Sequence, residues 1–322
     1  MKKLLVVLLS LVLVVSGVAW AQAQTVLKSA DNHVEGYPTV EGVKLLGKVI
    51  EEMTEGKYKV EVYTGSQLGS EKETVEQAIL GAIEMVRCST LTLAGFYEPM
   101  GILSLPYLFR DYDHQWKTIL GAPGQELVDG LLKDVGLVAL CWYEAGARSF
   151  YTIKGPIMKP EDVKGLKIRV PESPVLTNMV KFLKGAAVHI PFAEVYTALQ
   201  TGVVDGAENN PPSYYEMKHY EVAKHYSLDE HTRIPELVVM SKSVWEKFTP
   251  EERMILKVAA HASSVYERIL WQQYEERSLK AVQEGGAKIY NPDKSLFQKA
   301  MQPFYEEYSK YKNLINKILA VK

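Results

Sequence analysis

The chain alternates between helical and strand-like hydrophobic patterns along most of its length. Residues 38–55 place apolar side chains three and four positions apart, which predicts an amphipathic helix that Gly56 ends. Residues 57–63 alternate between apolar and polar positions, which predicts a half-buried strand. Further strands are indicated at 167–170 and 237–240. Because helices and strands alternate at lengths that suit βαβ units, the sequence predicts an α/β fold.

A much longer helical pattern lies towards the end of the chain. Thr249 is a typical helix N-cap, Pro250 suits the first turn, and the pattern continues to about Glu284, before two glycines. At 1.5 Å per residue, about 35 residues make a helix of roughly 50 Å, which is more than one small domain needs. We therefore expect this helix to lie across two domains. Two helices joined by a kink near residues 261–264 are the alternative.

Length, composition and charge narrow the class of protein. The 322 residues suggest two domains, at about 100–200 residues per domain. Hydrophobic residues at 47% and charged residues at 24% are ordinary globular values, which argue against disorder, collagen and coiled coil. A net charge of −2 gives no electrostatic reason to bind nucleic acid or an anionic membrane surface.

The first residues have the pattern of an export signal. Two lysines precede an apolar run over residues 4–15, and small residues follow this run. Two overlapping Ala-x-Ala patterns, which end at Ala21 and Ala23, are typical cleavage sites. The apolar run is short for a membrane anchor, so a signal peptide over residues 1–23 is favoured. We expect a soluble periplasmic protein, cleaved near Ala21 or Ala23.

Motifs for catalysis and metal binding are missing from the sequence. It has no Gly-x-Ser-x-Gly, His-Glu-x-x-His, Cys-x-x-Cys or Gly-x-Gly-x-x-Gly motif, and no two histidines have the i, i+4 spacing of a helical metal clamp. Cys88 and Cys141 could pair in an oxidising compartment or remain as separate buried thiols. The sequence therefore predicts no catalytic residue, no metal and no cofactor. An exported two-domain α/β protein of this kind is typical of a binding protein with a cleft between its domains.

Two arginines lie in apolar surroundings. Arg148 follows an apolar strand, and Arg169 lies inside the strand predicted at 167–170. A half-buried guanidinium needs an anion, because an unpaired buried charge costs several kcal/mol. An internal salt bridge to one of the 39 acidic residues and a carboxylate on a ligand are both open at this point.

Four segments resemble a known family. They are KGLKIRVP at 164–171, FAEVYTALQTGVVDGAEN at 192–209, QLGSE at 67–71 and LPYLF at 105–109. They are similar to the solute-binding proteins of TRAP (tripartite ATP-independent periplasmic) transporters, and the resemblance covers nearly all of the mature chain. It implies a two-lobe α/β fold with a hinge, a ligand cleft between the lobes and a long helix that crosses both.

The resemblance also implies the division of the chain and its task. Lobe I would hold residues 24–146 and 235–274, and lobe II would hold 147–234 and 275–322. The protein would capture an organic acid and deliver it to the membrane subunits of a TRAP permease for ion-driven uptake. It would be a receptor and not an enzyme, and the mature chain would not insert into the membrane.

The resemblance implies a role for individual residues. Arg169 matches the arginine that forms a bidentate bridge to the ligand carboxylate, which suits the planar fork of a guanidinium. Arg148 matches a second arginine near that carboxylate, Asn209 an asparagine at the same end, and Phe192 an aromatic wall. Further expected contacts with the rest of the ligand are Asn32, His33, Glu71, Ser89, Glu172 and Glu236. For Tyr214, ligand contact and simple packing are equal alternatives.

Three further segments, at 143–151, 209–215 and 228–236, resemble the members that bind sugar acids, especially hexuronates such as glucuronate and galacturonate. Other monocarboxylates and C4-dicarboxylates are the alternative ligands. A C4-dicarboxylate is disfavoured, because the residues expected at the distal end of the ligand are acidic. His231 and Arg233 are interpreted as polar residues where the chain crosses between the lobes. A sensor that acts on a membrane kinase is the alternative function, and a periplasmic uronate-converting enzyme is the least favoured.

Overall fold

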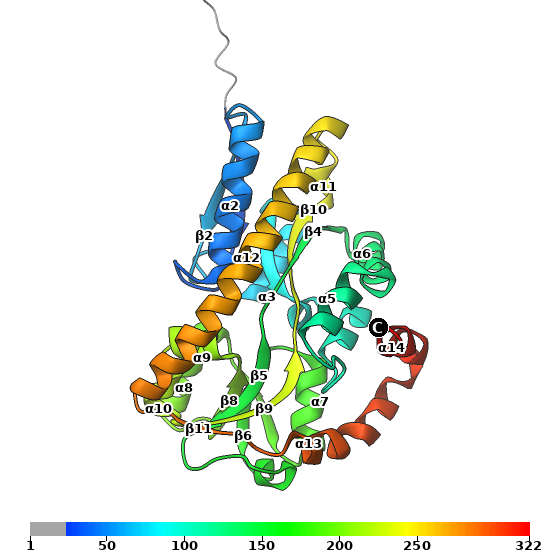
Figure 1. Cartoon of the computed structure of the whole chain (residues 1–322). Helices are drawn as coiled ribbons and strands as arrows, with labels where there is room; N and C mark the ends of the chain where they lie inside the picture. The colour runs from blue at the N-terminus through cyan, green and yellow to red at the C-terminus, as the bar shows by residue number, and fades with distance from the viewer. Residues whose placement is uncertain (1–23) are drawn as a thin grey trace, which may run out of the picture.

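The computed structural model describes residues 24–322, so the predicted signal peptide over 1–23 lies outside the described residues. Two β-sheets form the centres of two lobes, one above the other in Figure 1. We call the part built on the five-stranded sheet lobe I and the part built on the six-stranded sheet lobe II. The mixed α/β class predicted from the hydrophobic pattern is confirmed.

Lobe I is built on a mixed sheet with the strand order β2-β1-β3-β10-β4. Its strands are β1 (Thr25–Ala30), β2 (Tyr58–Tyr63), β3 (Met85–Ser89), β4 (Leu137–Tyr143) and β10 (Glu236–Ser241). Strand β1 runs parallel to β2 and β3, whereas β10 runs antiparallel between β3 and β4. Helices and 3-10 turns pack around this sheet: α2 (Pro38–Met53), α3 (Glu71–Ile79), α4 (Thr90–Leu93), η1 (Glu98–Ser104), α5 (Tyr112–Leu120), α6 (Ala122–Val135) and α11 (Lys242–Trp245).

Lobe II is built on a sheet with the order β11-β9-β5-β8-β6-β7. Its strands are β5 (Ala147–Thr152), β6 (Lys167–Val170), β7 (Ala186–His189), β8 (Gly206–Asn209), β9 (His225–Arg233) and β11 (Lys288–Tyr290). Its helices and turns are η2 (Pro160–Val163), α7 (Pro174–Phe182), η3 (Phe192–Glu194), α8 (Val195–Gln200), α9 (Pro211–Glu216), α10 (His219–Val222) and α13 (Lys294–Met301). The strand predicted at 167–170 is thus confirmed as β6.

Two short connections and one long helix cross between the lobes, in addition to the C-terminal segment. Residues 144–146 join β4 to β5, and residues 234–235 join β9 to β10. Helix α12 (Pro250–Glu284) packs on α2 and β4 of lobe I and on α9 of lobe II, as Figure 1 shows. Thr249 caps it by accepting from the backbone N–H of Glu252, and its 35 residues form one continuous helix. The prediction of a single helix across both lobes is confirmed, and the alternative of two kinked helices is wrong.

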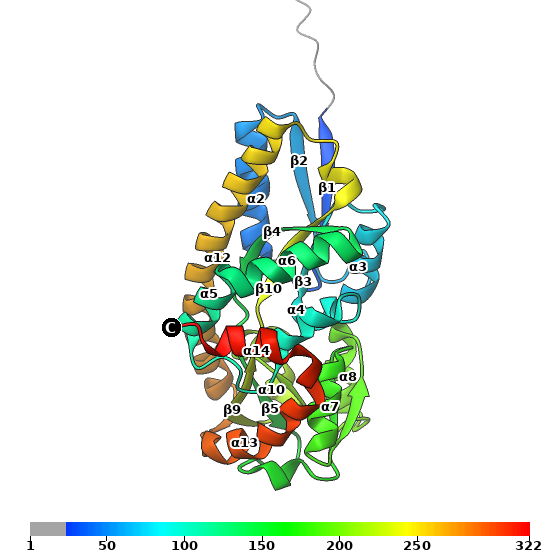
Figure 2. The ribbon, with the colours of Figure 1, turned by 90° about the vertical axis from the view of Figure 1, so that its right-hand side faces the viewer.

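The C-terminal segment also contacts both lobes. Strand β11 pairs with β9 and α13 packs on β9, whereas η4 (Gln302–Tyr311) leads to α14 (Lys312–Leu319), which lies against α6 (Figure 2). The sequence-based division assigned all of 275–322 to lobe II. In the structure α14 packs on lobe I, because its apolar face needs cover and finds it in the core cluster that includes residues of α6.

The two cysteines lie on different strands of the lobe I sheet. Cys88 on β3 pairs with Leu237 of β10, and Cys141 on β4 pairs with Val238 of the same strand. Strand β10 therefore separates them, and both are free thiols. Of the two alternatives that the sequence left open, separate thiols are the one found. Within residues 24–322, no helix has the length and apolar character needed to cross a membrane.

Candidate ligand-binding site

A cavity of about 550 Å³ lies between the two lobes. Its walls come from β3, α3 and the loop after β1 in lobe I, and from β6, β8 and residues 190–194 in lobe II. This volume is within the usual range for small-molecule sites. The predicted contact residues that line the cavity are Asn32, His33, Glu71, Ser89, Arg148, Arg169, Glu172, Phe192, Asn209 and Glu236.

Tyr214 is the predicted contact residue that the fold places elsewhere. Its side chain is fully buried and packs against Tyr151 and Tyr226 in the core of lobe II. Its hydroxyl donates to the backbone carbonyl of Ala223 at 2.6 Å. Of the two roles considered from the sequence, the structure places Tyr214 in the packing role.

Arg169 is a buried cation that faces the cavity without an acidic partner. It lies on β6, only 3% of it is exposed, and its Nε donates to the backbone carbonyl of Ile190 at 2.8 Å. In the described part of the chain, no carboxylate forms an ion pair with it, although it lines the cavity. Burial lowers the pKa of Arg169 to about 10, so the group stays charged at neutral pH. A charge in this position is ready to bind an anion.

Arg148, in contrast, forms an internal salt bridge, which is the other alternative that the sequence left open for a buried arginine. On β5, its Nε and Nη2 donate to the two carboxylate oxygens of Glu208 at 2.6 and 2.7 Å, and its Nη1 donates to Oδ1 of Asn209 at 2.7 Å. Burial opposes the charge of Arg148, but Glu208 outweighs this effect and raises its pKa. Arg148 therefore lines the cavity as a neutralised, fixed donor group.

A chain of charged groups behind Arg148 holds Glu208 in place. Nε2 of His231 lies 3.4 Å from Glu208, and its Nδ1 lies 2.9 Å from a carboxylate oxygen of Asp229. Burial disfavours a charge on His231, yet Asp229 and Glu208 prevail and raise its pKa to about 9. His231 is thus protonated at neutral pH. The sequence analysis missed this supporting role: Asp229 is only two residues away, but Glu208 lies 23 positions earlier in the chain.

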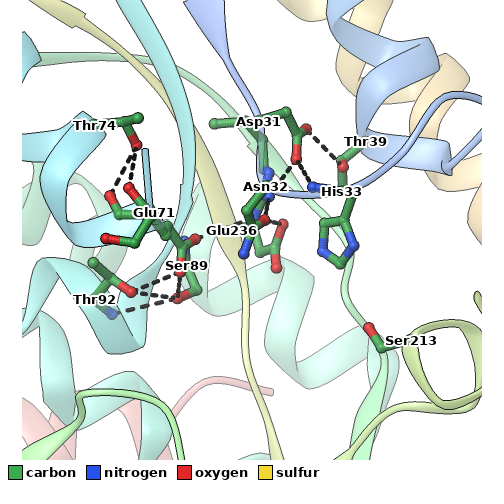
Figure 3. A network of polar contacts seen from close by, with 12 residues as sticks. Asp31, Asn32, His33, Thr39, Glu71, Thr74, Ser89, Thr92, Ser213 and Glu236 are labelled. Carbon is green, nitrogen blue, oxygen red and sulfur yellow. Dashed lines mark hydrogen bonds and ion pairs between the residues drawn. The ribbon is translucent and has the colours of Figure 1, made fainter. Parts of the chain in front are cut away.

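Arg87 is the main residue of the site that the sequence analysis missed. It lies on β3, is 1% exposed, and pairs with Asp31 and Asn32. It also donates to Glu236 at 2.9 Å and to Glu71 at 3.2 Å. One guanidinium therefore faces three carboxylates, and Figure 3 shows Asp31, Glu71 and Glu236 in this network. The available signal was an arginine in an apolar strand, the same signal that identified Arg169.

Two carboxylates of this network line the cavity, and they differ in how many further hydrogen bonds they can accept. Glu71 accepts from the backbone N–H of Ser89 at 2.6 Å and from the hydroxyl of Thr92 at 2.7 Å (Figure 3). Glu236 uses Oε2 for Arg87, while its other oxygen has no hydrogen-bond partner among residues 24–322. Burial raises the pKa of Glu236 above its ordinary value. This end of the cavity can accept hydrogen bonds from hydroxyl groups.

The lobes touch at both sides of the cavity. His33 stacks on Tyr37 at 3.7 Å between ring centres, and its Nδ1 lies 3.1 Å from Glu216 of lobe II. At the outer rim, Lys72 of lobe I pairs with Glu172 of lobe II at 2.8 Å, with about half of each side chain exposed. Phe192 of lobe II meets His33 edge-on, at 5.1 Å. Direct contacts between the two lobes are therefore present on both sides of the cavity.

The site has no set of residues suited to hold a metal: within the described residues, no group of three or more histidine, cysteine or acidic side chains is so arranged. Its chemistry is one unpaired cation at one end, fixed amide and guanidinium donors beside it, and acceptor oxygens at the other end. Such an arrangement fits a small molecule with one carboxylate and several hydroxyl groups.

Comparisons with known proteins agree with this geometry. Residues 29–311 match the family model described as bacterial extracellular solute-binding protein, family 7. A TRAP periplasmic solute-binding protein from Xanthobacter autotrophicus Py2, solved with bound β-D-galacturonate, is 42% identical with a TM-score of 0.89, covering 92% of this chain and all of the other. One from Pseudomonas putida F1, with bound D-glucuronate, is 39% identical with a TM-score of 0.89, covering 92% and 97%. A sialic acid-binding periplasmic protein of Vibrio cholerae is 31% identical, covering 92% of each chain.

Proposed function

The chain belongs to family 7 of the bacterial extracellular solute-binding proteins, as a TRAP solute receptor, and we propose that it captures a hexuronate such as glucuronate or galacturonate. The observation that carries the proposal is the unpaired, buried guanidinium of Arg169 in the wall of the inter-lobe cavity. The two solved relatives with bound galacturonate and glucuronate support the choice of ligand.

The carboxylate of the ligand would pair with the terminal nitrogens of Arg169. A guanidinium presents two parallel N–H groups that match the two oxygens of a carboxylate. Asn209 and Arg148 lie beside it, and Arg148 already shares its charge with Glu208, so Arg169 supplies the positive charge that the ligand neutralises. One unpaired cation suits one carboxylate.

The opposite wall would receive the sugar hydroxyls. Glu71 and Glu236 present carboxylate oxygens there, and Asn32 adds an amide. The three carboxylates around Arg87 exceed its single positive charge, so a second carboxylate on the ligand would meet net negative charge. This electrostatic balance favours a hydroxyl-rich monoacid over a C4-dicarboxylate.

The protein would act as a receptor without catalysis. Capture would draw the lobes together about the crossing segments at 144–146 and 234–235 and about α12, as in hinge closure. The loaded form would then deliver the sugar acid to the membrane subunits of a TRAP permease for ion-driven uptake. An extracytoplasmic, periplasmic location follows the family, and a cleavage site near Ala21 or Ala23 remains part of the proposal.

The test is a calorimetric titration of the mature protein with D-glucuronate, D-galacturonate, N-acetylneuraminate and succinate. D-Glucose serves as the analogue without a carboxylate. We expect one of the two uronates to bind most tightly and glucose not to bind. Tightest binding of succinate would refute the hexuronate assignment, and conversion of a uronate to a new product, followed by mass spectrometry, would refute the receptor assignment.

A further inference from the structure

A second cavity, of about 660 Å³, lies apart from the ligand cavity and shares no lining residue with it. Its walls come from the loop after η1 in lobe I, from the end of β9 in lobe II and from the C-terminal segment. The lining residues include Tyr107, Phe109, Arg110, Arg233, Lys294 and Tyr305. It is thus a space whose shape depends on how the two lobes are arranged.

Hydrogen bonds between the lobes hold one wall of this cavity. The backbone N–H of Tyr107 donates to the carbonyl of His231 at 2.8 Å, and its hydroxyl donates to the carbonyl of Asp229 at 3.0 Å. Tyr107 adopts a left-handed backbone conformation, with φ of 58°, which a tyrosine rarely adopts. From the C-terminal segment, the hydroxyl of Tyr305 donates to the carbonyl of Pro106 at 2.8 Å.

The lining of the cavity holds more cations than acidic groups. Arg110 donates two of its N–H groups to the backbone carbonyls of Leu319 at 3.2 Å and Val321 at 2.6 Å, neither of which is a carboxylate. Lys294 pairs with Glu230 at 2.7 Å. Arg233 is half-buried and, among the residues that the structure describes, has neither an ion-pair partner nor a hydrogen-bond acceptor. Three cations therefore face one carboxylate.

Three acidic residues outside the lining also act on these cations: Arg233 interacts electrostatically with Asp111, Glu144 and Glu275. Asp111 caps α5 by accepting from the backbone N–H of His114 at 2.8 Å. That bond, with Arg110 and Arg233 as weaker contributors, lowers the pKa of Asp111. The buried carboxylate of Glu144 is engaged by Trp116 and by the backbone N–H of Gly146.

We propose that this cavity is a second binding site, for an organic carboxylate with a flat apolar body. The fork of Arg233 would hold the carboxylate, and the rings of Tyr107, Phe109 and Tyr305 would pack against the apolar part. Because both lobes form its walls, an occupant binds one lobe arrangement better than another. Its binding is therefore coupled to binding in the ligand cavity, and the coupling acts in both directions.

The segment that joins β9 to β10 offers a physical route for this coupling. Arg233 ends β9, and Glu236, which lines the ligand cavity, begins β10 three residues later. His231, two residues before Arg233, contacts the Glu208 that holds Arg148. A shift of this short segment is therefore felt in both cavities. This coupling rests on the proposed function, whereas the existence of the second site does not.

The binding test uses benzoate as the probe, by calorimetry, on the Arg169→Gln variant, so that the ligand cavity lacks its carboxylate anchor. We expect benzoate to bind, and Arg233→Gln added to that variant to raise its Kd about tenfold or more. Arg277→Gln, which removes an exposed arginine outside both cavities, is the matched control and should change nothing. A circular dichroism melt of each variant checks folding, and Arg233→Lys should restore part of the binding.

Three outcomes would overturn the site. They are benzoate binding that Arg233→Gln leaves unchanged, absence of benzoate binding in the Arg169→Gln variant, and equal binding of the neutral analogue benzyl alcohol. Inorganic phosphate binding as tightly as benzoate would reject the aromatic part of the ligand class.

For the coupling, saturating benzoate should change the Kd of the wild-type protein for its uronate about fivefold or more, and Arg233→Gln should abolish that change. Tight uronate binding that benzoate leaves unchanged would overturn the coupling but keep the proposed function.

Discussion

Replacing Arg169 by methionine should weaken binding and, at the same time, stabilise the ligand-free protein. In the folded protein, burial lowers the pKa of Arg169 from its ordinary value to about 10. At pH 7, below both values, the group is charged in both the folded and the unfolded state, so the folded state bears the full penalty. At about 1.4 kcal/mol per pKa unit, this penalty is about 3 kcal/mol.

Part of that gain is lost with a hydrogen bond. Nε of Arg169 donates to the carbonyl of Ile190, and removing one such bond costs about 1 kcal/mol. The ligand-free Arg169→Met variant should therefore be about 2 kcal/mol more stable than the wild type at pH 7. Its affinity for the uronate should fall by about 2–5 kcal/mol, which is roughly a 30-fold to several-thousand-fold rise in Kd.

Urea denaturation without ligand and calorimetric titration with the uronate measure the two effects separately. The opposite signs make the test sharp, because a variant that is merely damaged would lose both stability and binding. Arg277→Met removes an exposed arginine that stacks on Tyr274 outside the ligand cavity, so it should lower stability by at most about 1 kcal/mol and leave the affinity unchanged. A ligand-free Arg169→Met protein that is less stable than the wild type, yet binds the uronate equally well, would refute the reasoning.

Three further predictions concern other parts of the molecule. Lys72 and Glu172 form a half-exposed pair across the rim, so Lys72→Ala should raise the Kd less than about fivefold, and high salt should remove the effect; a larger, salt-independent loss in calorimetry would contradict this. Burial raises the pKa of Glu275 to about 7, so its destabilising charge is absent below about pH 4.5 and fully present above 7. Glu275→Gln should therefore stabilise the protein at pH 8, by at most about 3 kcal/mol, and have almost no effect at pH 4, as measured by urea denaturation; equal effects at both pH values would argue against it. Cys88 and Cys141 should both titrate as free thiols in the denatured protein without a reductant, and a thiol titre that rises after reduction would contradict strand separation.

Local sequence patterns predicted the elements that carry the site. The alternation at 57–63 and the apolar run at 167–170 correspond to β2 and β6, and Thr249 marks the start of α12. These predictions hold because periodicity and capping depend on neighbours within a few residues. The same pattern placed Arg169 on a buried strand. It applies equally to Arg87, whose carboxylate partners Asp31 and Glu236 are 56 and 149 positions away in the chain.

The partner of each buried charge depended on the tertiary structure. Arg148 and Arg169 have similar local surroundings, and β8 lies between their strands, β5 and β6. Glu208 of β8 is in register with Phe150, so it shares a face of the sheet with Arg148, whereas Arg169 is in register with Ala207 and so lies on the face opposite Glu208. Arg169 lies on β6, and no acidic side chain of the described chain pairs with it. Arg148 and Glu208 are 60 positions apart in the chain. The register of the strand pairing, which no short-range pattern encodes, therefore separates a neutralised arginine from one that is available to a ligand.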